Sequence, residues 1–307
     1  MSNKTALILL RCFDNQLTSL YVTQNTSLAE LSCQNNQLTI LDYNGCNSLQ
    51  SIHCQSNQIT SLDVSGLTNL TIFSFDNNPL TYLDISNCTG LSGTFNVDGG
   101  GSGPNLSTLN ITGCSNITEL SCMNNSLTML DFTGCNSLQS IFCNDNQIAS
   151  LDVNGLTNLT NFNFDNNPLT YLDISNCTGL SGIFNAYFPG GSLSTLNITG
   201  CTNITHLDCM GNSLTSLDFT GCNSLQSIMC NDNQITSLDV SGLTNLTNFT
   251  FDNNPLTYLD ISNCTGLTGI INAYFPGGSL STLNITGCSN ITHLDCMGNS
   301  LTSLDFT

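Results

Sequence analysis

The sequence has very few cations. Only Lys4 and Arg11 stand against 21 acidic side chains, and the formal net charge is −19 at pH 7. Proteins bind nucleic acid largely through Lys and Arg side chains that displace counterions from phosphates. Two cations near one end of the chain cannot supply this attraction, so we exclude nucleic acid and anionic membrane surfaces as partners.

Long apolar runs are absent as well. No stretch approaches the roughly 20 apolar residues that cross a bilayer. The apolar segment 6–10 ends at Arg11, which is too early for the h-region of a secretory signal, about 7–15 residues long. We therefore expect no membrane insertion, and no signal peptide is present in this segment.

Catalytic motifs are missing too. The sequence contains no phosphate-binding Walker loop and no G-x-G-x-x-G followed by a helix. Its three histidines, His53, His206 and His293, lie far apart in the sequence, and no C-x-x-C pair accompanies them to form a zinc site. We predict that the protein is not an enzyme and needs no cofactor.

What the sequence does have is a repeat of 21 residues. Leu7, Leu28, Leu49, Leu70 and Leu91 mark successive starts, and the spacing returns after each of three irregular coils near 91–116, 180–203 and 267–290. A fixed period of this length indicates stacked coils that share one core. We predict a single solenoid over residues 1–307, with about fourteen coils on the 21-residue spacing.

Each regular coil follows L-x-x-L-x-C-x-x-N-x-L-T-x-L-D-x-x-x-C-x-x, as in residues 28–48. Leu28, Leu31 and Cys33 alternate as in a short strand, and Leu38, Leu41 and Tyr43 suggest a second extended segment. Thr, Asn, Asp and Gly fill the connections and favour turns over helical crossovers. The fold class should be mainly β, with stacked parallel strands and little or no α-helix.

This pattern resembles the leucine-rich-repeat superfamily, and the 21-residue form with a following L-x-x-L-D is similar to its bacterial IRREKO-type class. The resemblance covers essentially the whole chain. It implies a right-handed solenoid that serves as a recognition scaffold, often at a cell surface, with the parallel sheet as the contact face. The superfamily shares no catalytic residue.

Three columns of side chains, one of asparagine and two of cysteine, should be structural. Buried amides at a turn can satisfy backbone groups of their own and the neighbouring coil. The asparagine column comprises Asn15, Asn36, Asn57, Asn78, Asn125, Asn146, Asn167, Asn212, Asn233, Asn254 and Asn299. The 17 cysteines occupy two further repeated positions where Phe or Leu substitutes, so we expect buried thiols rather than disulfides.

A column of aspartates follows the second apolar segment. It comprises Asp42, Asp63, Asp84 and Asp305 together with Asp131, Asp152, Asp173, Asp218, Asp239 and Asp260, and Asn110, Asn197 and Asn284 interrupt it. We expect each carboxylate to point outward, so the column is a ladder of like charges that must be hydrated, hydrogen-bonded or neutralised. Calcium between the coils is the alternative. Its candidate ligands are the six aspartates from Asp131 to Asp260.

The irregular coils carry insertions. The segments NAYFPGG at 185–191 and 272–278 replace a glycine-rich stretch in the first irregular coil, and residues 159–220 match 246–307 at all but four of 62 positions. Inserted loops on a rigid scaffold often carry recognition. Tyr187, Phe188, Tyr274 and Phe275 are the candidate binding residues, unless one ring of each pair fills the core.

These observations favour a non-enzymatic extracellular or cell-surface scaffold that binds or adheres to protein or glycan. A calcium-stabilised acidic solenoid is one alternative. Another is a structural protein that joins copies of itself end to end into filaments, because residues 1–2 and 306–307 occupy the same coil positions. A segment cut from a longer array would show the same open ends.

Overall fold

The protein is described by a computed structural model over residues 6–99, 105–187, 191–273 and 279–304. The described part contains strands and turns but no α-helix. Contacts divide the chain into two compact units, Met1–Ala149 with Asn161–Asn167, and Ser150–Thr160 with Pro168–Thr307. The prediction of one continuous domain over 1–307 stays a prediction.

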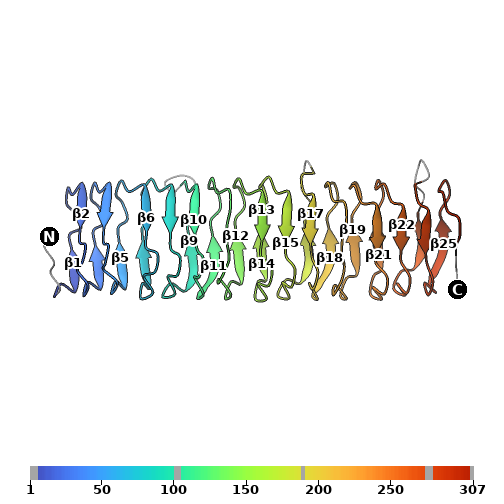
Figure 1. Cartoon of the computed structure of the whole chain (residues 1–307), viewed down its shortest axis with the longest axis horizontal. Coiled ribbons are helices and arrows are strands. Elements are labelled where there is room, and N and C mark those ends of the chain that lie inside the picture. The colour runs from blue at the N-terminus through green and yellow to red at the C-terminus, as the bar shows by residue number, and fades with distance from the viewer. Residues whose placement is uncertain (1–5, 100–104, 188–190, 274–278, 305–307) are drawn as a thin grey trace. The chain divides into compact units, whose positions relative to one another are not determined.

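In both units every coil contributes up to two short strands, which form two series (Figure 1). The first series follows the L-x-x-L-x-C half of the repeat. In the first unit it consists of β1 (Leu9–Arg11), β3 (Glu30–Ser32), β5 (Ser51–His53), β7 (Ile72–Ser74), β9 (Gly93–Asn96), β11 (Ile117–Ser121), β12 (Ser140–Phe142) and β14 (Asn161–Asn163). In the second unit it consists of β16 (Gly182–Asn185), β18 (Ile204–Asp208), β19 (Ser227–Met229), β21 (Asn248–Thr250), β23 (Gly269–Asn272) and β25 (Ile291–Asp295).

The second series follows the T-x-L-D half of the repeat. In the first unit it consists of β2 (Ser19–Tyr21), β4 (Ile40–Asp42), β6 (Ser61–Asp63), β8 (Tyr82–Asp84) and β10 (Thr108–Asn110). In the second unit it consists of β13 (Ser150–Asp152), β15 (Tyr171–Asp173), β17 (Thr195–Asn197), β20 (Ser237–Asp239), β22 (Tyr258–Asp260) and β24 (Thr282–Asn284).

All strand pairs are parallel, and each strand pairs with its counterpart in a neighbouring coil. In the first unit the sheets have the orders β1-β3-β5-β7, β2-β4, β10-β8-β6 and β14-β12-β11-β9. In the second they are β13-β15-β17, β16-β18-β19-β21, β20-β22-β24 and β23-β25. The stacked strands form a β-solenoid of about 13 turns. The predicted mainly β fold with parallel strands is therefore confirmed, with about one coil fewer than expected.

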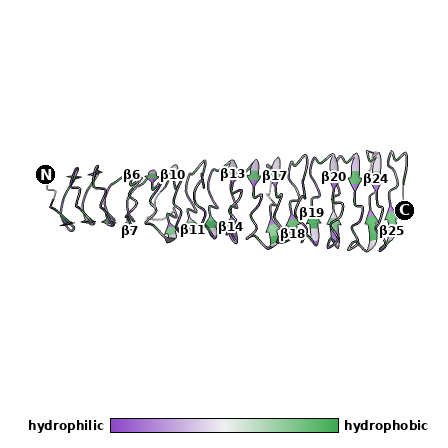
Figure 2. Cartoon of the chain, turned by 60° about the horizontal axis from the view of Figure 1, so that its bottom comes forward, coloured by the Kyte–Doolittle hydropathy of each residue, from purple (hydrophilic) through white to green (hydrophobic). Residues whose placement is uncertain are grey.

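The core is built from the repeated apolar positions. Leu28, Leu31 and Leu38 are fully buried, as are their counterparts in most other coils. Figure 2 shows the apolar colour recurring on strands such as β14, β18 and β19. Burial of apolar side chains stabilises a fold by about 25 cal/mol per Å², and one coil alone cannot enclose its leucines. Stacking is therefore the condition for stability.

The turn before each ladder asparagine requires a left-handed backbone. Asn35 has a φ of 56° and Asp145 a φ of 58°, whereas Gly211 takes the same turn with a φ of 63°. L-residues rarely adopt this conformation, and Asn, Asp and Gly do so at the lowest cost. The local choice of residues thus agrees with the turn that brings each asparagine inward.

The asparagines hold consecutive coils together. Asn146 is buried, and its Nδ2 donates to the carbonyl of Cys143 in its own coil at 3.0 Å and to that of Cys122 in the preceding coil at 2.9 Å. Its Oδ1 accepts the Leu127 N–H at 3.0 Å. The same pattern recurs at Asn36, Asn57, Asn78, Asn125, Asn167, Asn233 and Asn254.

The ladder changes at the irregular coils of the second unit. Asn212 still donates to the Ala186 carbonyl at 2.8 Å, and Asn299 donates to the Ala273 carbonyl at 2.7 Å. Their Oδ1 atoms, however, have no donor among the described residues. The insertions therefore keep the donor half of the ladder and lose the regular acceptor half.

Replacement of Asn146 by Ala should be costly because it leaves backbone carbonyls and an N–H buried without a partner. We expect Asn146→Ala to lower the free energy of unfolding by about 3 kcal/mol, given about 1–3 kcal/mol for each unsatisfied buried group. Urea denaturation measures this loss. The matched control is Asn69→Ala at an exposed position, where we expect a change within about 0.5 kcal/mol; equal effects would contradict a structural role of the ladder.

Candidate functional site

The two strand series present different outer faces. In register, the outward positions of the second series repeat closely: Ser61, Tyr82 and Thr108 in the first unit, and Ser237, Tyr258 and Thr282 in the second. Outward positions of the first series differ between the units, since Thr94 and Glu119 of the first unit stand where the second unit has Ile183 and His206. A surface that varies over an invariant scaffold is the better candidate for recognition.

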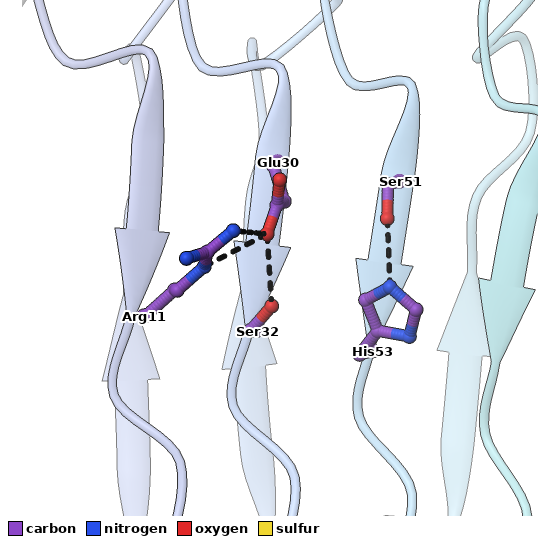
Figure 3. A network of polar contacts seen from close by, with 5 residues as sticks. All are labelled: Arg11, Glu30, Ser32, Ser51 and His53. Atoms are coloured by element: carbon purple, nitrogen blue, oxygen red, sulfur yellow. Dashed lines mark hydrogen bonds and ion pairs between the residues drawn. The ribbon is translucent and has the colours of Figure 1, made fainter.

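Near the start of the chain this face carries a group of polar contacts (Figure 3). Arg11 on β1 forms an ion pair with Glu30 on β3, with 3.0 Å between Nη2 and Oε1. Ser51 and His53 on β5 lie 2.9 Å apart through Oγ and Nε2. The ion pair is substantially exposed, and such pairs contribute about 0–1 kcal/mol. We assign it no role in holding the fold together.

In the second unit the same face carries exposed isoleucines beside histidines. Ile183 on β16 is 75% exposed and lies in register with His206 on β18. Ile270 on β23 is 70% exposed and lies in register with His293 on β25. Large apolar side chains at this exposure mark interaction surfaces when polar groups surround them. We call these two pairs the Ile–His patches.

Each Ile–His patch fixes the tautomer of its histidine when the ring is neutral. The Thr205 hydroxyl donates to the Gly182 carbonyl at 3.1 Å, and its oxygen lies 2.9 Å from Nδ1 of His206. A hydroxyl has one proton to donate, so here it accepts from the Nδ1–H group. The Nε2 atom is then the acceptor that the ring offers to a partner. Thr292, Gly269 and His293 repeat this arrangement.

Of the predicted loop aromatics, the structure describes Tyr187. Its side chain is 47% exposed, and its backbone N–H donates to Oδ1 of Asn185 at 2.8 Å. The ring lies over the next coil, because a Cβ on Gly211 would come within 3.2 Å of its Cε2 atom. Phe188, Tyr274 and Phe275 lie outside the described residues. The binding role of the four aromatics therefore stays a prediction.

The aspartate column caps turns. In the calcium candidates Asp131, Asp152, Asp173, Asp218, Asp239 and Asp260, Oδ1 accepts the backbone N–H two residues further on at 2.8–2.9 Å. Asn197 and Asn284 do the same at 3.2 Å. A carboxylate or amide oxygen in this position mimics a backbone turn, so the column has a structural use in every one of these coils.

The expectation that every aspartate faces solvent is wrong at Asp84, Asp173 and Asp260, which are 7–9% exposed. Asp173 accepts hydrogen bonds from Ser175, from Asn197 at 2.9 Å and from Tyr171 at 3.2 Å. Burial alone would raise the pKa of Asp173, but these hydrogen bonds together lower it below the ordinary value. The interrupting asparagine thus stabilises the charged carboxylate by donating an amide hydrogen bond to it, which sequence reasoning missed.

Calcium binding by the aspartates stays a prediction. Within the described ranges, no group of three or more His, Cys, Asp or Glu side chains is placed to hold a metal ion. The exposed carboxylates of Asp152 and Asp239 sit in register with the buried carboxylates of Asp173 and Asp260. In each such pair the buried member already receives several donors.

All 17 cysteines are free thiols. Those of the second cysteine column donate to a carbonyl of the preceding coil, as Cys177 does to Val153 at 3.1 Å and Cys264 does to Val240 at 3.0 Å. Burial raises the pKa of Cys33 and Cys143 to about 12. The prediction of buried thiols rather than disulfides is confirmed for fourteen of them, while Cys12, Cys288 and Cys296 are partly exposed.

The repeated L-x-x-L-x-C-x-x-N-x-L pattern and the parallel-strand solenoid that it forms are consistent with a leucine-rich-repeat protein. No helix in the described ranges is both long and apolar enough to cross a bilayer. No protein-family model and no curated protein matches the chain.

Solved structures similar to the chain include leucine-rich-repeat proteins. The functional domain of InlJ from Listeria monocytogenes, which includes a cysteine ladder, is 28% identical over 92% of this chain and 69% of that one, with a TM-score of 0.41. A leucine-rich-repeat protein of Leptospira interrogans is 20% identical over 95% and 78%, with a TM-score of 0.43. The leucine-rich effector YopM of Yersinia pestis is 19% identical over 83% and 86%, with a TM-score of 0.37.

Burial and raised pKa values should protect most thiols from alkylation, because only an accessible thiolate reacts. In a short iodoacetamide pulse at pH 8 we expect labelling first at Cys12, Cys288 and Cys296. Mass spectrometry of the digested protein locates the labels, and a pulse in denaturant provides the fully reactive control. Rapid native labelling of Cys143 would contradict its burial.

The calcium alternative makes a separate prediction. A cation that binds only the folded state raises the melting temperature by linkage. Thermal melts in excess calcium and in excess chelator should then differ by several degrees. Superimposable melting curves would contradict calcium binding. Hydrogen bonds and hydration alone would then stabilise the charged aspartates.

Proposed function

We propose that this chain is a non-enzymatic scaffold of the extracellular space or cell surface, which binds a protein partner through the outer face of the first strand series. The leucine-rich-repeat fold is typical of non-enzymatic binding scaffolds. The observation that carries the proposal is the pair of Ile–His patches. Ile183 and Ile270 expose apolar surface to water, which is unfavourable, and the free energy falls when a partner covers them.

The patches supply both affinity and orientation. Covering Ile183 or Ile270 removes apolar surface from water, and a fully covered side chain of this size contributes about 1.5–3 kcal/mol. The Nε2 atoms of His206 and His293 accept a hydrogen bond from one direction. Asn185 with Asp208, and Asn272 with Asp295, lie in register beside the patches. Interfaces commonly combine an apolar centre with such a polar rim.

Repetition adds a further advantage. The two patches have the same residues in the same register, 87 positions apart in the sequence. A partner with two matching surfaces would bind the second patch at a high effective concentration, so that the combined affinity exceeds that of either patch. The strong conservation of sequence between the two blocks is consistent with such bivalent use.

The filament alternative stays a prediction. Exposed apolar side chains do occur near the start of the described chain, at Ile8, Leu9 and Phe13. They belong to the first described coil, and nothing within the described residues indicates that a second copy covers them. The adhesive role and the binding role of the loop aromatics likewise stay predictions.

The test is binding to a panel of surface-displayed proteins, measured by biolayer interferometry. For any protein captured by the wild type, we expect Ile183→Asp combined with Ile270→Asp to weaken binding at least tenfold, which corresponds to about 1.4 kcal/mol. A charge at the centre of an interface is left without a partner. Melting temperature should change little, because both side chains are exposed.

The matched control is Ile40→Asp. Ile40 lies on β4 of the second series and is 47% exposed, so the same chemical change is made on the other outer face. Undiminished binding by the double variant, or equal loss in the control, would remove the Ile–His patches from the interface.

A further inference from the structure

The second strand series is split at three places, after Tyr43, Phe132 and Phe219, and the first and last of these lie inside one unit. At regular junctions two backbone N–H groups donate to the next coil. Val64 donates to the Asp84 carbonyl and Gly66 to that of Ser86, each at 2.8 Å. Neither bond forms from Tyr43 and Gly45 to the coil of Asp63, nor from Phe219 and Gly221 to the coil of Asp239, within the residues described. We call the first and the last of these places, each inside one unit, the split junctions.

The cause is an aromatic side chain in a slot that usually holds Val or Ile. Val22, Val64, Val153 and Val240 occupy this slot in regular coils, whereas Tyr43 and Phe219 occupy it at the split junctions and Phe132 occupies it at the third place. The Phe219 ring is 5% exposed, so it lies in the core. An enlarged side chain in a packed core forces its surroundings apart. Here the coils separate along the aspartate edge.

The opposite edge of the same coils stays closed. Across the split junctions, the Leu38 N–H still donates to Oδ1 of Asn57 at 2.9 Å, and the Leu214 N–H donates to Oδ1 of Asn233 at 3.0 Å. The separation is also visible at a glycine. A Cβ on Gly242 would meet no atom within 4 Å, whereas one on Gly221 would lie 3.0 Å from Cα of Gly200. The two coils are therefore farther apart at the aspartate edge than at the asparagine edge, and we call this wedge-shaped separation the wedge.

Each split junction contains a groove. The first measures about 420 Å³ and is lined by Asp42, Tyr43, Gly45, Asn47, Asp63 and Ser65 among others. The second measures about 370 Å³ and is lined by the equivalent Asp218, Phe219, Gly221, Asn223, Asp239 and Ser241 among others. Both volumes lie within the range of small-molecule sites, about 300–1,000 Å³. The same groove thus occurs in each unit.

The grooves differ in one contact. In the first, the Tyr43 hydroxyl donates to the Asp63 carbonyl at 2.6 Å and replaces the missing backbone bond. Phe219 has no hydroxyl, and no described residue donates to the Asp239 carbonyl. The second groove therefore has one more acceptor left for a ligand. Backbone groups that lack a protein partner must find one elsewhere.

We propose that the two grooves are binding sites for a neutral saccharide unit. The lining of each combines acceptors, the paired carboxylates, with donors, the unpaired backbone N–H groups of Phe219 and Gly221 in the second groove. A sugar hydroxyl both donates and accepts, so a ring with several hydroxyls matches such a mixed lining. These sites lie on the second strand series, away from the Ile–His patches, and the proposal does not depend on the proposed function.

The charge of the grooves selects among ligands. Two carboxylates and no Lys or Arg line each groove. Anionic sugars and phosphorylated ligands are repelled by this pair of like charges. A neutral sugar can replace hydrating water without leaving a polar group unpaired, which is the condition for affinity at a polar site.

The experiment is saturation-transfer NMR with the full chain and a panel of neutral mono- and disaccharides at millimolar concentration. Ser65→Trp combined with Ser241→Trp fills both grooves from exposed positions without changing the core. We expect the saccharide signal of the wild type to fall at least fivefold in this variant. Thr68→Trp combined with Thr244→Trp, at exposed positions of the same coils outside the linings, should retain it.

A second variant tests the wedge itself. Phe219→Val restores the regular side chain, so the N–H of Gly221 should gain a backbone partner and exchange with solvent more slowly, by about tenfold or more. The saccharide signal from the second groove should then fall while that from the first remains. Tyr43→Val is the reciprocal variant.

Three results would overturn the proposal. One is the absence of signal from every saccharide in the panel. Another is an equal signal from the groove-filling variant and the Thr68/Thr244 control. The third is a shift of the Phe219 and Gly221 amide resonances by calcium chloride alone with no response to any sugar, which would make the grooves cation sites instead.

Discussion

The solenoid depends on the satisfaction of backbone hydrogen bonds between consecutive coils. Each coil is too short for a helix and too narrow for a sheet of its own, so its buried N–H and C=O groups must find partners in the next coil. The parallel strand pairs supply some of these partners. The buried asparagines supply the rest at the turn, where no strand reaches, and they do so with a side chain that bonds two coils at once.

This constraint explains which side chains are free to vary. Positions that point inward, or that cap the turns, recur because every coil has the same groups to satisfy. Outward positions of the first strand series neither fill the core nor cap a turn. Ile183, His206 and their counterparts occupy such positions. The face that can specify a partner is thus the face that contributes least to stacking, as is common where recognition residues sit on a rigid scaffold.

The same constraint shows why the split junctions stand out. An aromatic ring at Tyr43 or Phe219 separates the coils along one edge only, because the asparagine edge remains bonded. The following coil carries Leu67 or Leu243 where a cysteine would otherwise donate to the carbonyl of the preceding coil. The larger ring and the missing thiol hydrogen bond therefore occur at the same pair of coils. Both changes favour a wider separation of those two coils along this edge.

The sequence by itself determined the period, the parallel β architecture, the inward asparagines and the burial of most thiols. These follow from a pattern repeated in every coil, since identical coils can share a core in very few ways. Only the tertiary structure decided that Asp84, Asp173 and Asp260 are buried, that Asn197 and Asn284 bond the neighbouring carboxylates, and that Ile183 is exposed. Those features depend on the separation and register between particular coils. Side-chain volume in the neighbouring coil sets that separation, as the ring of Phe219 shows, and a position-by-position pattern does not contain it.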